Sequence, residues 1–211
     1  MVFWYLQAVR SVHAKVGVDP AMEPRADMGS GKEGSWDGIR RGERTGMQPR
    51  LEYGKAAPGA VMAMRRLEVY VRDCGLEHSL LELVKLRASQ INGCAYCVDM
   101  HTKDARAMGE TEQRLYAVVV WEETPFFTER ERAALTWTEA VTLVGEEHVP
   151  DDTYEQAHRN FDEKELVDLT LAVIAINGWN RLAISFRAVP GAYQPAAPKK
   201  VSVETAGSPT Q

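Results

Sequence analysis

The chain has 211 residues, of which 45% are hydrophobic and 26% are charged, and its formal net charge is −5. These values are ordinary for a soluble globular protein with one domain, or at most two small ones. The mildly acidic charge argues against nucleic-acid binding, which needs a basic surface. No apolar run approaches the roughly 18–20 residues of a membrane span. We therefore expect neither nucleic acid nor a membrane as a partner.

Cysteine usage indicates a reducing compartment. The chain has 3 cysteines, too few and too unevenly placed for the disulfide framework of a secreted domain. The first residues, MVFWYLQAVR, have no preceding basic residue and no small-residue cleavage site after them, so they do not resemble a signal peptide. We expect a cytoplasmic protein in which two closely spaced cysteines form a working pair.

The two ends of the chain differ from its middle. Residues 1–46 are rich in glycine and charge without an apolar period, which predicts a disordered or weakly structured extension. Residues 194–211 are rich in proline, alanine and polar residues, which predicts a flexible tail. Residues 47–193 then form the folded domain.

Apolar residues in this middle segment recur at helical spacing, and no convincing strand pattern is present. The pieces 116–121 and 169–176 would suit buried strands by composition, but their caps and lengths favour helices. We predict an all-α fold, a compact multi-helix domain with six or seven helices and short loops. The expected helices are 60–74, 79–91, 94–108, 111–121, 128–144, 154–160 and 162–189.

Capping signals mark the start of three of these helices. Thr128 and Glu131 form a capping box. Asp151 or Asp152 is expected to cap the short helix that follows, and Asp162 opens the last one.

The densest cluster of reactive groups is CAYCVDMH, from Cys94 to His101. On a helix Cys94, Cys97 and His101 occupy positions i, i+3 and i+7, which places two thiols and an imidazole on one stripe. A dithiol one turn apart can close into a disulfide, and a nearby imidazole can accept a thiol proton. Gly93 places the pair in the first helical turn, where the helix dipole favours a thiolate. The cluster therefore favours thiol redox chemistry.

Two other interpretations of the cysteines stay open. Cys94 and Cys97 could be buried small hydrophobic residues without chemistry. They could also join His101 and either Glu82 or Asp99 in a zinc site. Structural zinc sites usually draw on two separated ligand pairs, and the chain has no second Cys or His pair.

Glu82 also has two interpretations. Ser79 and Glu82 match a capping box, in which the glutamate only supports the start of a helix. Helix geometry also permits a contact with His101 on an antiparallel neighbour, because the offsets along the two helices are about 18 Å and about 10 Å. The spacing alone does not decide between these roles.

Glu82 followed by INGCAYCVDMH resembles the alkylhydroperoxidase D-like core of the carboxymuconolactone decarboxylase superfamily. Its redox members carry E-x11-C-x2-C-x3-H with Asn-Gly before the first cysteine, and all these spacings hold here. The match runs from about Met47 to Tyr193 and includes INGWNRLAI at 176–184. One position departs, because Tyr96 stands where some members have a second histidine.

The resemblance implies an all-helical, homo-oligomeric peroxidase, a trimer or hexamer, that uses no metal and no organic cofactor. Cys97 would attack the peroxide and become a sulfenic acid, and Cys94 would be the proton donor and resolving thiol. Glu82 and His101 would form the proton relay. The apolar run Leu171–Ile176 also needs cover, which a subunit interface would provide.

We therefore expect an enzyme, a thiol-dependent peroxidase that reduces hydroperoxides through a dithiol–disulfide cycle. A thiol reductant protein or a dihydrolipoyl group would restore the dithiol. The alternative is a redox-sensing or zinc-binding helical module that regulates a partner. Family members without the cysteine pair catalyse other reactions, including lactone decarboxylation, which has no use for a dithiol.

Overall fold

The computed structural model describes residues 46–195, and this part of the chain is all-α, as predicted. The predictions for residues 1–45 and 196–211 lie outside the described residues, so the proposed domain limits stay predictions. The elements, in chain order, are α2 (Tyr53–Ala56), α3 (Pro58–Asp73), α4 (His78–Ile91), α5 (Ala95–Ala107), α6 (Glu112–Ala117), the 3-10 helix η2 (Val118–Glu123), α7 (Glu129–Thr142), α8 (Val144–Glu147), α9 (Asp151–Asn160) and α10 (Glu163–Phe186).

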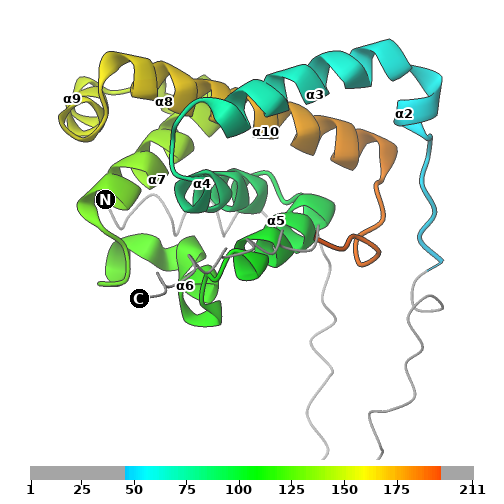
Figure 1. The fold of residues 1–211 in the computed structure, drawn as a ribbon, viewed down its shortest axis with the longest axis horizontal. Coiled ribbons are helices and arrows are strands. Elements are labelled where there is room, and N and C mark those ends of the chain that lie inside the picture. Colours follow the sequence, from blue (N-terminus) through cyan, green and yellow to red (C-terminus); the bar gives the residue numbers. More distant parts are fainter. Residues whose placement is uncertain (1–45, 196–211) are drawn as a thin grey trace, which may run out of the picture. The chain divides into compact units, whose positions relative to one another are not determined.

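The central element is α4, which contacts α5, α7, α10 and η2 (Figure 1). All of its residues from Leu80 to Leu86 are buried, and Leu83, Val84 and Leu86 are at most 1% exposed. Seven consecutive residues make almost two helical turns and so include every face of the helix, which means that α4 is covered on all sides. Two charged residues, Glu82 and Lys85, are nevertheless buried within it, so the core helix also carries polar chemistry.

The last helix, α10, packs along α3, α4 and α7 (Figure 1). By length and composition alone it would be long enough and apolar enough to cross a membrane. Its buried side chains, including Leu169, Val173 and Ile176, instead belong to the protein core. Within the apolar run 171–176 only Ile174 is exposed, so this chain itself covers most of that run.

The single helix predicted for residues 111–121 is wrong, because the chain changes to a 3-10 helix after Ala117. Val120 has non-helical angles, φ −127° and ψ 32°. In a 3-10 helix, residues i and i+3 lie on the same face. Val118 and Trp121 are therefore both buried, whereas Val119 between them is exposed.

The structure shows neither the capping-box interpretation of Ser79 and Glu82 nor the predicted cap at Asp151 or Asp152. Helix α4 begins one residue before Ser79, and its N-cap residue, Glu77, makes no side-chain capping bond. Helix α9 begins at Asp151 after Pro150, whose fixed φ already suits the entry to a helix. The capping box of Thr128 and Glu131 is confirmed.

The final helix ends three residues earlier than predicted, at Phe186. Arg187 adopts a left-handed conformation, φ 55°, and the N–H of Ala188 donates to the carbonyl of Ala183 at 2.8 Å. This turn reverses the chain. Residues 187–195 then run back to α5, where Tyr193 and Pro195 line a pocket.

Candidate active site

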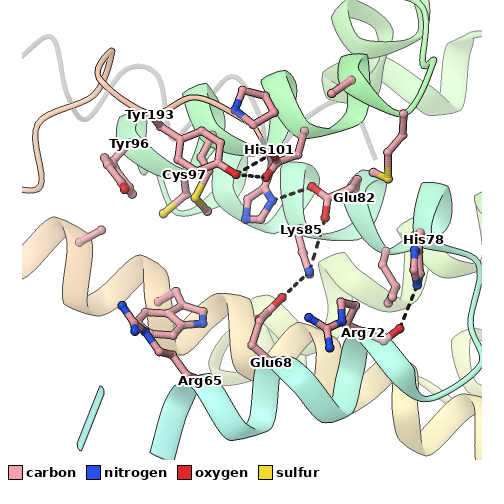
Figure 2. A pocket seen from close by; sticks show the side chains of 18 of the residues that line it. Arg65, Glu68, Arg72, His78, Glu82, Lys85, Tyr96, Cys97, His101 and Tyr193 are labelled. Carbon is pink, nitrogen blue, oxygen red and sulfur yellow. Dashed lines mark hydrogen bonds and ion pairs between the residues drawn. The ribbon is translucent and has the colours of Figure 1, made fainter. Parts of the chain in front are cut away.

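The two cysteines of the motif lie at the start of α5. Cys94 is the N-cap residue, and its sulfur accepts a hydrogen bond from the N–H of Cys97 at 3.4 Å. The two residues are joined by a disulfide, with their Cα atoms 5.4 Å apart. Both are 1% exposed, and Cys97 lines the pocket shown in Figure 2. The expected position in the first helical turn is confirmed.

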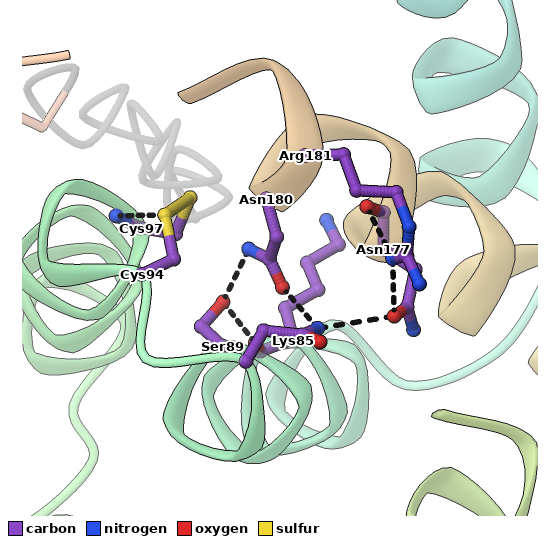
Figure 3. The surroundings of a disulfide bond; sticks show 8 residues. Lys85, Ser89, Cys94, Cys97, Asn177, Asn180 and Arg181 are labelled. Carbon is purple, nitrogen blue, oxygen red and sulfur yellow. Dashed lines mark hydrogen bonds between the residues drawn. A yellow bond between two sulfur atoms is a disulfide. The ribbon is translucent and has the colours of Figure 1, made fainter. Parts of the chain in front are cut away.

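The turn before Cys94 is held by a partly buried network of side-chain amides that connects it to α10 (Figure 3). Gly93 has φ 67°, a conformation that suits glycine. The side-chain amide of Asn92 donates to the oxygens of Asn177, at 3.0 Å, and Asn180, at 2.8 Å. Asn180 in turn donates to the Ser89 hydroxyl at 3.0 Å. This network fixes the loop that presents the thiols.

His101 and Glu82 are in direct contact. The Nδ1–H of His101 donates to Oε2 of Glu82 at 2.7 Å, and both side chains are buried. This bond leaves Nε2 on the other edge of the ring. Cys97 lies one helical turn before His101 on α5, so the three side chains follow one wall of the pocket in the order Cys97, His101, Glu82 (Figure 2).

The charge on Glu82 is stabilised by its neighbours. Burial raises the pKa of this carboxyl, but the hydrogen bond and charge of His101, together with Lys85, lower it more, so the pKa lies below its ordinary value. Glu82 is therefore an ionised acceptor at neutral pH, the form that fixes the tautomer of His101.

Two further charged residues, Lys85 and Glu68, extend the site beyond Glu82, and neither was among the site residues predicted from the sequence. The Nζ of Lys85 lies 3.4 Å from Oε1 of Glu82 and 2.5 Å from Oε1 of Glu68 on α3. The Lys85 side chain is only 7% exposed. The sequence signal that could have identified Lys85 is a lysine between apolar residues of α4, because burying an unpaired charge there would be costly.

Tyr193 and Asp104 close the other side of the site. The Tyr193 hydroxyl donates to both carboxylate oxygens of Asp104, at 2.7 and 3.0 Å. Burial and the neighbouring Asp104 carboxylate raise the pKa of Tyr193, so it remains protonated. Its segment is tied to α5 because Lys103 donates to the Tyr193 carbonyl and Asp99 accepts from the N–H of Gly191.

The pocket has a volume of about 690 Å³ and is lined by residues of α3, α4, α5 and α10 and by Tyr193 and Pro195. Cys97, His101 and Glu82 reach it together with Lys85. Most of the remaining surface is apolar or aromatic, including Leu81, Met100, Met108, Trp179 and Ala183. Such a pocket can hold a small organic molecule against a thiol that has its own proton acceptor.

The zinc set considered from the sequence is not assembled. The two sulfurs are joined to each other, and Asp99 pairs with Lys103 at 2.8 Å. Among the described residues, Glu82, His101 and Asp104 each bring one possible ligand atom within 4.8 Å of the others, without either cysteine. The Lys85 ammonium beside Glu82 opposes a cation there.

Comparisons with known proteins agree with this architecture. Residues 56–140 match the model of the carboxymuconolactone decarboxylase family. The uncharacterized protein YdfG of Bacillus subtilis is 43% identical over 139 residues, which cover 66% of this chain and 95% of YdfG.

Two solved structures are similar as well. One is a protein of unknown function from Agrobacterium tumefaciens, proposed as an antioxidant defence protein AhpD, with a TM-score of 0.67, 47% identity, and coverage of 69% of this chain and 100% of that one. The other is the debrominase Bmp8, with a TM-score of 0.60, 18% identity, and coverage of 65% and 74%, a likeness of fold alone. The chain belongs to the carboxymuconolactone decarboxylase family and has the alkylhydroperoxidase D-like fold.

Proposed function

We propose that the protein is a thiol-dependent peroxidase. The observation that carries the proposal is the arrangement of Cys97 within disulfide reach of Cys94 and one turn from His101, which is itself bonded to Glu82. This arrangement supplies a nucleophile, a resolving thiol and a proton acceptor at one pocket. The alkylhydroperoxidase D-like fold of the family supports the same chemistry.

In the first step His101 accepts the proton of the Cys97 thiol, and the thiolate attacks the terminal oxygen of a hydroperoxide. The O–O bond breaks, the peroxide is reduced by two electrons, and the leaving alkoxide takes the proton from His101 to become an alcohol. Cys97 is thereby oxidised to a sulfenic acid. The ionised Glu82 stabilises the imidazolium that forms between these transfers.

In the second step the Cys94 thiol attacks the sulfenic sulfur of Cys97. A disulfide forms and one water molecule leaves. A thiol reductant protein or a dihydrolipoyl group then gives two electrons and two protons to restore the dithiol. We also propose that the protein acts in the cytoplasm, where such reductants keep thiols reduced.

Steady-state kinetics test this proposal. Reduced protein is mixed with tert-butyl hydroperoxide and excess dithiothreitol, and peroxide consumption is followed with Cys97→Ser as the control. We expect many turnovers with the native chain and none with the variant. A native chain that consumes one equivalent and then stops would support the redox-sensing alternative. Stoichiometric zinc in the purified reduced protein would support the zinc-binding one.

A further inference from the structure

Lys85 is a buried cation next to the Glu82 carboxylate. It comes from the middle of α4, its side chain is 7% exposed, and its two ion-pair partners are both glutamates. Burying an ammonium group is costly unless it is paired. The fold keeps this charge at the pocket although the peroxide reaction described above gives it no step.

The two carboxylate oxygens of Glu82 contact different residues. Oε2 accepts from His101 at 2.7 Å, and Oε1 faces Lys85 at 3.4 Å. Lys85 therefore contacts the oxygen that His101 does not use. Glu68 of α3 holds the ammonium from the other side at 2.5 Å (Figure 2). The result is a chain of alternating charge from Glu68 of α3 through Lys85 to Glu82 of α4, which ends at the hydrogen bond to His101 on α5.

We propose that Lys85 is a positioning residue, which acts through Glu82 to keep that carboxylate ionised and aimed at His101. The proposal rests on the proposed relay function of Glu82 and His101. A protonated Glu82 would not favour imidazolium formation, and the Cys97 thiolate would lose its partner. Lys85 thus widens the pH range, on the acid side, over which Cys97 reacts.

No other charged group at the pocket replaces Lys85. Asp104 on α5 is a carboxyl bonded to Tyr193, so it adds negative charge. Arg72 of α3 lies in the same pocket but forms its ion pair with Asp73. His78 of α4 hydrogen-bonds to the carbonyl of Arg72, at 3.0 Å. Arg65 of α3 also lines the pocket, yet among the lysines and arginines of the described residues only Lys85 forms an ion pair with Glu82.

A competing explanation is that Lys85 has only a structural role, in which its ion pair with Glu68 joins α4 to α3. The two explanations differ in what they expect of Lys85→Met and Glu68→Gln. Either change breaks the ion pair, so a purely structural role predicts the same effect for both. Positioning of Glu82 requires the charge of Lys85 and not that of Glu68. In Glu68→Gln the ammonium remains and has Glu82 as its one acidic partner.

The test measures the rate at which iodoacetamide alkylates Cys97 in the reduced protein as a function of pH. A Cys94→Ser background leaves Cys97 as the reactive thiol of the pair. In Lys85→Met we expect the acid limb of the profile to move to higher pH by about 1–3 units, the effect of removing one nearby charge. Lys85→Arg should restore the native profile, and Glu68→Gln should not move the limb to higher pH.

The matched control is Arg87→Met. Arg87 is also a largely buried cation of α4, with a side chain 17% exposed and bonded to Glu139 at 2.6 Å, and it does not line the pocket. It should leave the profile unchanged. If Lys85→Met proves unstable, the double variant Lys85→Met/Glu68→Met removes both members of this partly buried pair, so that neither charge is left without its partner, and the same shift is expected.

Equal behaviour of Lys85→Met and Glu68→Gln, with loss of stability and no shift of the limb, would overturn the proposal. Alkylation does not involve peroxide, so this result is separate from a failure of the proposed function. That failure would appear as a native protein that alkylates normally but turns over no hydroperoxide.

Discussion

The Nδ1–H of His101 donates to the carboxylate of Glu82 across 2.7 Å, although the two residues are 19 positions apart in the chain. They come from α4 and α5, which pack against each other. A capping role, one of the two interpretations of the sequence, would have turned Glu82 back towards Ser79, and instead its two oxygens face Lys85 and His101. Glu82 is thus in position to act on His101, and its effect on Cys97 can be measured.

Replacing either member of this pair should slow the thiol reaction without stopping it. Glu82→Gln and His101→Gln leave both cysteines in place and remove only proton transfer, which is typically worth about 10²–10⁴ in rate. Stopped-flow measurement of single-turnover peroxide reduction, well below the melting temperature, checks this. Ser79→Ala is the control and should leave rate and stability unchanged. An unchanged rate in Glu82→Gln would remove Glu82 from the relay.

The two cysteines should fail in different ways when replaced by serine. Cys97→Ser removes the nucleophile, so we expect no reaction with peroxide. Cys94→Ser should consume about one peroxide per subunit and then stop as a sulfenic acid, which dimedone traps and mass spectrometry detects on Cys97. A dimedone adduct on Cys94 in the Cys97→Ser variant would show that the assigned roles are reversed.

Stability should fall at both ends of the pH scale. Burial raises the pKa of Glu82, but His101 and Lys85 lower it more, so its folded pKa is below the unfolded value. Its contribution is therefore complete above about pH 4.3 and is lost as the pH falls through the folded pKa.

The opposite holds for Lys85, whose folded pKa is raised. Burial lowers it, and the two neighbouring glutamates raise it further than burial lowers it. Its contribution is complete below about pH 10.4 and is lost as the pH rises through the folded pKa. Urea unfolding from pH 3 to pH 11 measures both limbs, and Lys85→Met should flatten the alkaline one. An alkaline limb that is equally steep in Lys85→Met would assign it to other groups.

The amide network behind the cysteines should matter for stability and for disulfide formation. Asn180 is fully buried and bonds to Asn92 and Ser89. Asn180→Ala removes both bonds, at a cost of about 1–3 kcal/mol in the free energy of unfolding, and should slow disulfide closure because the Cys94 turn loosens. Denaturant melts and thiol-release kinetics measure the two effects. Asn160→Ala on α9 is the control. Unchanged closure kinetics would restrict the network to a stabilising role.

Much of the fold could be predicted because it depends on local pattern. Helical periodicity gave the main helices, and the Thr128–Glu131 capping box fixed the start of α7. The change to 3-10 geometry at Val118 could not be predicted, because it depends on burying Trp121, whose indole N–H donates to Glu139 of α7. That contact is tertiary and leaves no local signal.

The residues of the candidate site also differ in whether the sequence could predict them. Cys94, Cys97 and His101 share one helix, so their spacing already placed them together. Lys85 and Tyr193 were missed because each has a partner in another part of the chain, with Glu68 being 17 residues from Lys85 and Asp104 being 89 residues from Tyr193. A charged residue in an apolar helix predicts that a partner exists, but not which residue it is.

Self-association remains a prediction and now has a specific surface. Val167, 60% exposed, and Ile174, 50% exposed, lie seven residues apart on α10, with the half-buried Leu171 between them. This spacing forms one apolar stripe on a helix, and an interface between copies would remove it from water.

We expect light scattering to give a trimer or hexamer, and Ile174→Glu to give a mass near 23.6 kDa, that of one chain. Glu155→Lys, an exposed change on α9, controls for altered surface charge and should leave the mass of the assembly unchanged. A native protein that already scatters as a single chain at micromolar concentration would contradict the prediction, and an assembly that persists in Ile174→Glu would place the interface elsewhere.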